Sequence, residues 1–172
     1  MIALVIIVIG LLGVAKMQAL SLASTSVSRL RALAAIEAAS LASSMHVNRA
    51  YWAAATLTSP IVITSSTATT SDSTLSSAFT TVGSAGTAYC IPGAGAPCAP
   101  VTMAAADLRG WATEMNRMLP NASARITCPT TSIPLTCSIQ ISWTENAVAI
   151  NKQSGTTGGA FRIPTYTLDV EP

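Results

Sequence analysis

An unbroken apolar segment, MIALVIIVIGLLGVA, opens the chain, and the first charged residue is Lys16. As a helix this segment would be about 22 Å long, whereas the hydrocarbon core of a membrane is about 30 Å thick. A secretory signal peptide would carry basic residues before its apolar run, and none precedes Lys16. We therefore expect a membrane helix, and its short apolar length predicts a few further residues upstream of Met1.

The apolar segment continues into a sequence that favours helix. No proline occurs before Pro60 and no glycine between Gly13 and Gly83, so one helix is predicted from residue 1 to about residue 54. We expect residues 1–19 to be its transmembrane or assembly part and residues 20–172 to form the globular domain. The apolar contacts of the first part are assigned to Ile2, Leu4, Ile6, Ile9, Leu12 and Val14.

Beyond Lys16 the helix becomes amphipathic, with apolar residues at steps of three and four. This first stripe comprises Leu20, Ala23, Val27, Leu30, Ala34, Ala38, Leu41, Met45 and Trp52. A second stripe on roughly the opposite side comprises Leu22, Leu33, Ile36 and Val47. Two stripes imply two packing partners, the protein's own domain and another molecule. The alternative is that the second set is scattered exposed apolar side chains, which are common on protein surfaces.

Charged residues are scarce, at 9% of the chain, and the formal net charge is only +2. This composition excludes an acidic disordered chain and provides no basic stripe for a polyanion. Aromatic residues that could stack on bases make up only 5% of the chain. We therefore expect no nucleic-acid partner and a single globular domain, for which 172 residues suffice.

The four cysteines form two short-range pairs, Cys90 with Cys98 and Cys128 with Cys137. Four cysteines allow three connectivities, and loop-closure entropy favours the two local disulfides. Zinc is the weaker alternative, because neither pair has a zinc-site spacing and the only histidine, His46, is distant in sequence. Disulfides imply an oxidising compartment, so an export signal or membrane anchor is expected. The apolar N-terminus is the candidate.

Residues 56–87 are rich in Ser and Thr and are predicted to be loop that could carry O-glycans, apart from one short strand starting at Pro60. A short helix is predicted from Thr102, its N-cap, to Leu119, because Pro120 would end it. The apolar face of this helix comprises Leu108, Trp111, Met115 and Met118.

Two strands, 125–128 and 138–143, are predicted to form a hairpin that a disulfide between Cys128 and Cys137 would clamp at its loop end. A third strand, 165–170, alternates in the same way, and residues 151–160 are predicted to be loop. The expected fold class is α+β, with a long N-terminal helix packed on a small antiparallel sheet and one additional short helix.

Catalytic chemistry finds no support in the sequence. His46 is the only histidine, and no two acidic residues have a recognisable acid–base spacing. Glu114 is expected to make ordinary surface contacts with Arg117 or Arg109. The segment IPGAGAPCAP does not match a phosphate-binding pattern. We expect no enzyme activity, no cofactor and no metal site.

Three segments together resemble a known family. MIALVIIVIGLLGVAKMQ is similar to the N-terminus of type IV pilins, and IGLLGVAKMQ looks most like minor pilins of the PilV type. DLRGWATEMNRMLPNASARI resembles that family's Trp-containing helix ending in Leu-Pro, and CSIQISW its apolar strand ending in Trp. In the family a basic leader, a Gly-Phe cleavage site and a Glu in the apolar run come first. None of these precedes Met1, which again predicts upstream residues.

The resemblance implies a pilin-like fold and an assembly function. Such subunits lie in the bacterial inner membrane with a periplasmic domain, and are extracted from lipid into the helical core of an extracellular pilus. Minor pilins of this type prime assembly at the tip, together with other minor pilins, the major pilin, a tip adhesin and an inner-membrane assembly platform. Lys16 would then mark the membrane surface. The alternatives are a type II secretion pseudopilin and a membrane-anchored adhesin or DNA-uptake subunit that uses residues 56–100.

Overall fold

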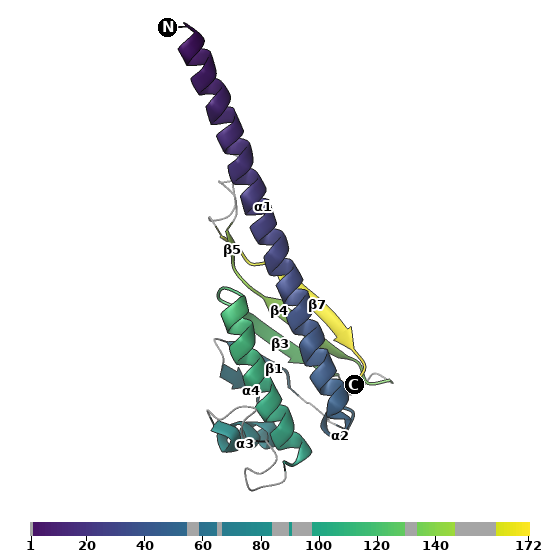
Figure 1. Ribbon diagram of the computed structural model, residues 1–172. Coiled ribbons are helices and arrows are strands. Elements are labelled where there is room, and N and C mark those ends of the chain that lie inside the picture. Colours follow the sequence, from purple (N-terminus) through teal and green to yellow (C-terminus); the bar gives the residue numbers. More distant parts are fainter. Residues whose placement is uncertain are drawn as a thin grey trace.

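The computed structural model describes residues 2–54, 59–64, 67–83, 90, 98–129, 134–146 and 161–172 (Figure 1). One long helix, α1 (Ile2–Val47), projects from the domain, and the other elements gather around its C-terminal half (Figure 1). With 46 residues, α1 is roughly 70 Å long. The predicted α+β class, a long N-terminal helix with a small antiparallel sheet, is confirmed, and the arrangement is consistent with a pilin-like fold.

The helix predicted to reach residue 54 is interrupted at Asn48. α1 ends at Val47, and a single turn, α2 (Arg49–Trp52), follows. Asn48 is buried, its backbone leaves the helical region (φ −104°, ψ 49°), and its Nδ2 donates a 2.8 Å hydrogen bond to the Pro100 carbonyl oxygen. The prediction missed this break because the partner of Asn48 lies far along the chain.

The main sheet has five antiparallel strands in the order β2-β1-β3-β4-β7. Its strands are β1 (Ile61–Thr64), β2 (Thr67–Thr69), β3 (Ser123–Thr127), β4 (Cys137–Ser142) and β7 (Thr165–Val170). A separate ribbon pairs β5 (Glu145–Asn146) with β6 (Phe161–Arg162). The three predicted strands of the C-terminal half are confirmed within one or two residues, as is the short strand after Pro60.

The strand register places apolar residues in rows on one face of the sheet. Ile126 pairs with Ile61 on one side and with Ile139 on the other, and Ile139 in turn pairs with Leu168. The opposite face carries polar side chains, including Ser123, Arg125, Gln140, Thr165, Thr167 and Asp169. One face of the sheet is therefore apolar and must be covered by other elements, as the alternation predicted.

Two helices cover the apolar face of the sheet. α1 packs against β4, β7 and α4 (Pro100–Met118), while α4 packs against β2 and a further helix, α3 (Ser73–Val82). Figure 1 shows α1 and α4 side by side across the sheet. The largest side chains fully enclosed between these layers are Leu41, Met45, Trp52, Ile61, Ile63, Leu75, Leu108, Met115, Leu119, Ile126, Ile139 and Trp143.

Helix α3 was not predicted, so the expectation of one additional short helix is wrong. The Asp72 side chain caps it by accepting a 2.8 Å hydrogen bond from the Leu75 N–H. Its buried residues are Leu75, Ala78, Phe79 and Val82. These follow steps of three and four, but the surrounding Ser and Thr residues made the segment resemble loop.

Helix α4 begins earlier than predicted. Its N-cap is Ala99, which makes no side-chain capping bond, with Pro100 at the first helical position, so the assignment of Thr102 as N-cap is wrong. Proline is favoured there because its missing N–H would be unpaired in any case. At the other end the helix stops before Pro120 as predicted, but Met118 is exposed and Leu119 is buried in its place. The other predicted core residues of this helix are buried: Leu108, Trp111 and Met115.

Both local disulfides are present. Cys90 is bonded to Cys98 with a Cα–Cα distance of 5.6 Å, and Cys128 to Cys137 with 4.1 Å. The second bond joins the end of β3 to the start of β4, so it closes the hairpin at its loop end as predicted. Within the predicted loops, residues 55–58, 65–66, 84–89, 91–97 and 151–160 lie outside the described residues.

Candidate membrane and assembly helix

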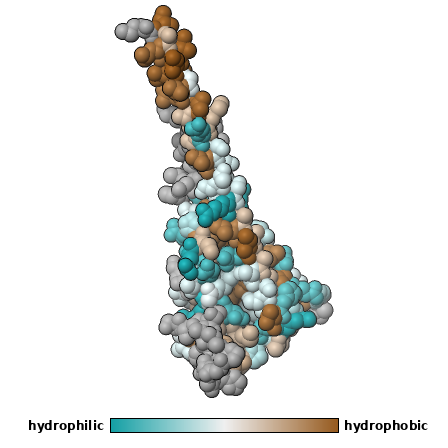
Figure 2. Space-filling view, in the orientation of Figure 1, coloured by the Kyte–Doolittle hydropathy of each residue, from teal (hydrophilic) through white to brown (hydrophobic). Residues whose placement is uncertain are grey.

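The N-terminal part of α1 is exposed over its entire circumference. Its large apolar side chains have no partner among the described residues, and none of its most apolar stretch is buried against the domain. By length and composition α1 can cross a membrane. Figure 2 shows this end as a continuous apolar surface. The predicted membrane residues are 53% to 79% exposed: Ile2, Leu4, Ile6, Ile9, Leu12 and Val14.

The C-terminal half of α1 is packed into the domain. Burial increases along the first stripe, from half-buried Leu20, Val27 and Leu30 to fully buried Leu41 and Met45. Trp52, in α2, completes the stripe and is also buried. Leu30, Leu41, Met45 and Trp52 pack in or against the core, whereas Leu20 and Val27 are partly buried without belonging to it.

The second stripe is partly as predicted. Leu22, Ile36 and Val47 are exposed, with 62% to 74% of their surface accessible, whereas Leu33 packs against the edge of the core. The structure thus leaves a row of three apolar side chains on α1 that the domain does not cover. In the sequence, these three residues follow the apolar segment that could enter lipid.

A buried carboxylate fixes α1 to the end of the sheet. Glu145, 3% exposed, accepts a 3.1 Å hydrogen bond from the Trp143 indole Nε1 and bonds of 3.3 and 3.4 Å from Nε and Nη2 of Arg31. Arg31 is mostly exposed, so one end of this ion pair is in water and the other in the core. The sequence did not predict this link, because 114 residues separate the partners.

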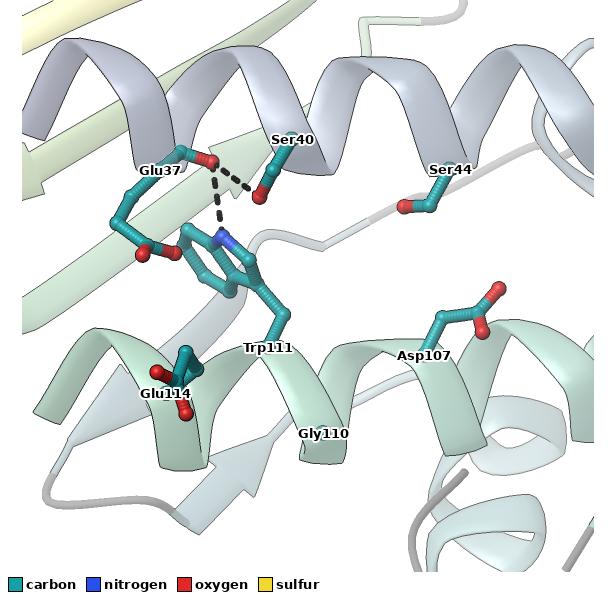
Figure 3. Close-up of a pocket in the computed structure, with 7 residues that line it drawn as sticks. All are labelled: Glu37, Ser40, Ser44, Asp107, Gly110, Trp111 and Glu114. Carbon is teal, nitrogen blue, oxygen red and sulfur yellow. Dashed lines mark hydrogen bonds between the residues drawn. The ribbon is translucent and has the colours of Figure 1, made fainter. Parts of the chain in front are cut away.

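A groove of about 360 Å³ separates α1 from α4 (Figure 3). Trp111 reaches across it and donates a 2.9 Å hydrogen bond from Nε1 to the backbone oxygen of Glu37, which also accepts from Ser40 Oγ at 3.0 Å. The groove is lined by Glu37, Ser40, Ser44, Asp107, Gly110, Trp111 and Glu114. Three carboxylates that looked scattered in the sequence therefore line the same groove.

Two carboxyl groups of the groove, those of Glu37 and Asp107, have raised pKa values. Burial, and then the charge of Glu114, raises the pKa of Glu37 above its ordinary value. Burial also raises the pKa of Asp107. Glu114 makes the predicted contact with Arg117, at 3.2 Å on the exposed side of α4, while Arg109 instead lies over the Phe79 ring. Within the described residues, no three His, Cys, Asp or Glu side chains are close enough to hold a metal ion.

Comparison with known protein families, curated proteins and solved structures finds no match to this chain. The features that bear on function are therefore those of the structure itself, a long helix with an exposed apolar half and a domain with two disulfides. The apolar half is compatible with a membrane anchor. The disulfides indicate an oxidising periplasmic or extracellular environment for the domain.

Proposed function

We propose that this protein is a minor type IV pilin, a structural subunit that primes pilus assembly and lies at the pilus tip without catalysing a reaction. The observation that carries this proposal is the division of α1 into an exposed apolar half and a half built into the domain. The likeness of three sequence segments to PilV-type minor pilins supports it independently of the structure. The expected partners are other minor pilins, the major pilin, a tip adhesin and the inner-membrane assembly platform.

The energetics of the exposed half require a partner at all times. Burying one large aliphatic side chain contributes about 1.5 to 3 kcal/mol. Ten such side chains are exposed between Ile2 and Val14: Ile2, Leu4, Val5, Ile6, Ile7, Val8, Ile9, Leu11, Leu12 and Val14. Together they represent on the order of 15 to 30 kcal/mol, more than the typical stability of a whole domain. Lipid before assembly and neighbouring helices afterwards both satisfy this requirement.

Substitution of Ile9 by lysine tests the proposal. A charge at the centre of a membrane helix costs about 2.5 to 3.5 kcal/mol on insertion scales. In the native host, we expect Ile9→Lys to abolish membrane insertion and reduce the number of surface pili, as counted by electron microscopy. Ile9→Leu is the matched control and should leave both unchanged. Normal piliation by the Ile9→Lys strain would refute the assembly function.

A further inference from the structure

The groove between α1 and α4 contains a carboxylate that has no partner among the described residues. Glu37 is only 7% exposed, yet its carboxylate accepts no hydrogen bond and meets no cation among the described residues. Only its backbone oxygen is bonded. Figure 3 shows the carboxylate extending from α1 toward α4, on the side of the Trp111 ring where Glu114 lies.

A second carboxylate faces the groove from the other helix. Asp107 extends from α4 toward α1 and the Ser44 hydroxyl in Figure 3, and its carboxylate likewise has no hydrogen bond or ion pair among the described residues. Glu114 is already paired with Arg117 on its outer side. Among the described residues, no cation balances the charges of Glu37 and Asp107, so the groove attracts a positively charged group.

The chemistry of the lining favours one kind of cation. A metal ion would need several close ligands, and the described residues provide no such group. An arginine guanidinium, by contrast, is planar and offers five donors, so it can bind one carboxylate through two hydrogen bonds and still donate to a neighbouring hydroxyl. The acceptors here are the carboxylates of Glu37 and Asp107 and the hydroxyls of Ser40 and Ser44, beside the face of an indole. Guanidinium groups also interact favourably with aromatic rings.

We propose that the groove receives an arginine side chain from a neighbouring protein subunit, with its guanidinium against the Glu37 carboxylate. That this subunit belongs to the pilus rests on the proposed function, whereas the arginine specificity rests on the groove alone. The contact would add a polar, directional element to an assembly otherwise held by apolar helices. It would favour subunits that present arginine at the matching position over those that do not.

Binding of a model arginine to the full-length protein in detergent micelles tests this inference. N-acetyl-arginine amide should shift the indole N–H resonance of Trp111 in a saturable manner, while those of Trp52 and Trp143 should stay in place. N-acetyl-citrulline amide has nearly the same shape without the charge, so it should bind about tenfold more weakly or not at all. Equal binding of the two compounds would overturn the proposal.

Variants separate the groove from other acidic surfaces. Glu37→Gln keeps the backbone oxygen that Trp111 uses, so the fold should persist, and it should weaken binding of the arginine amide by about tenfold. Asp107→Asn should also weaken it. Asp169→Asn, on the exposed polar face of the sheet, is the matched control and should leave binding unchanged. Loss of affinity in all three variants, or in none, would contradict the assignment, as would tighter binding of calcium than of the arginine amide.

The two proposals can fail separately. If the arginine amide does not bind while Ile9→Lys reduces the number of pili, the groove assignment is wrong and the pilin function stands. If it binds while Ile9→Lys leaves piliation normal, the arginine site stands and its placement in a pilus is wrong.

Discussion

The Glu145 carboxylate offers the sharpest test of how α1 is held to the domain. Replacing Glu145 with alanine removes the acceptor of the buried Trp143 indole and the partner of Arg31. An unsatisfied buried donor costs about 1 to 3 kcal/mol. The ion pair adds little, at most about 1 kcal/mol, because the Arg31 side chain is 62% exposed and screened by water.

The expected loss for Glu145→Ala is therefore about 2 kcal/mol, and most of it arises from the indole. For a chain of this size, that corresponds to a decrease in Tm of roughly 4 to 8 °C. Glu145→Gln should be much milder, because its amide oxygen can still accept from Trp143. The measurement is thermal unfolding of the full-length protein in detergent under oxidising conditions, followed by circular dichroism.

Two further measurements make this reasoning refutable. Glu171→Ala removes an exposed carboxylate and should leave the Tm unchanged, so equal losses for Glu145→Ala and Glu171→Ala would refute it. Amide exchange should also become faster in residues 20–36 of the Glu145→Ala variant, because among the described residues Arg31 makes the polar contact to the domain that lies nearest the apolar half of α1. A Glu145→Gln variant as unstable as Glu145→Ala would show that the ion pair, not the indole bond, dominates.

Three other perturbations have defined outcomes. Cys128→Ser should destabilise the domain by about 2 to 4 kcal/mol in chemical denaturation, and an unchanged midpoint under oxidising conditions would contradict this. The pKa of Glu37 is raised in the folded state, which means that the fold favours the protonated carboxyl. Ionisation of Glu37 therefore lowers the stability of the fold as the pH rises above 4.5, the ordinary pKa of a glutamate side chain. Glu37→Gln should therefore be more stable than wild type at about pH 7, with a gain that shrinks toward about pH 4; a pH-independent gain would exclude this cause. Ile36→Ser should reduce pilus number without affecting membrane insertion or Tm, because the domain leaves Ile36 exposed.

Local patterns were sufficient for the elements whose side chains repeat. The steps along α1 and the alternation of Ile139, Ile141 and Trp143 each reflect a single buried face, so sequence alone located them. α3 obeys the same rule, but only four of its ten residues are buried, and the other six are all Ser or Thr. There the informative signal was the cap, Asp72, preceding Leu75 by three residues.

Contacts between distant segments could not be predicted in this way. The Trp111 indole donates a hydrogen bond to the backbone oxygen of Glu37, 74 residues away. Every residue has such an oxygen, so the sequence does not show which one accepts. The groove exists only because α1 and α4 pack side by side, which brings Glu37 and Glu114 together. Periodicity indicates which face of each helix is buried, but not how two helices are aligned lengthwise.

In the pilus proposed above, the second stripe would contribute to the stability of the assembled fibre. Side chains between Ile2 and Val14 would exchange lipid for other apolar helices, and since both surroundings are apolar, this transfer gains little from the hydrophobic effect. Leu22, Ile36 and Val47 lie beyond the apolar segment and are exposed in the structure. Their burial against neighbouring helices would contribute about 1.5 to 3 kcal/mol each. If the protein is the pilin proposed above, the apolar half of α1 would confine it to lipid or fibre, while the exposed stripe beside the domain would favour the fibre.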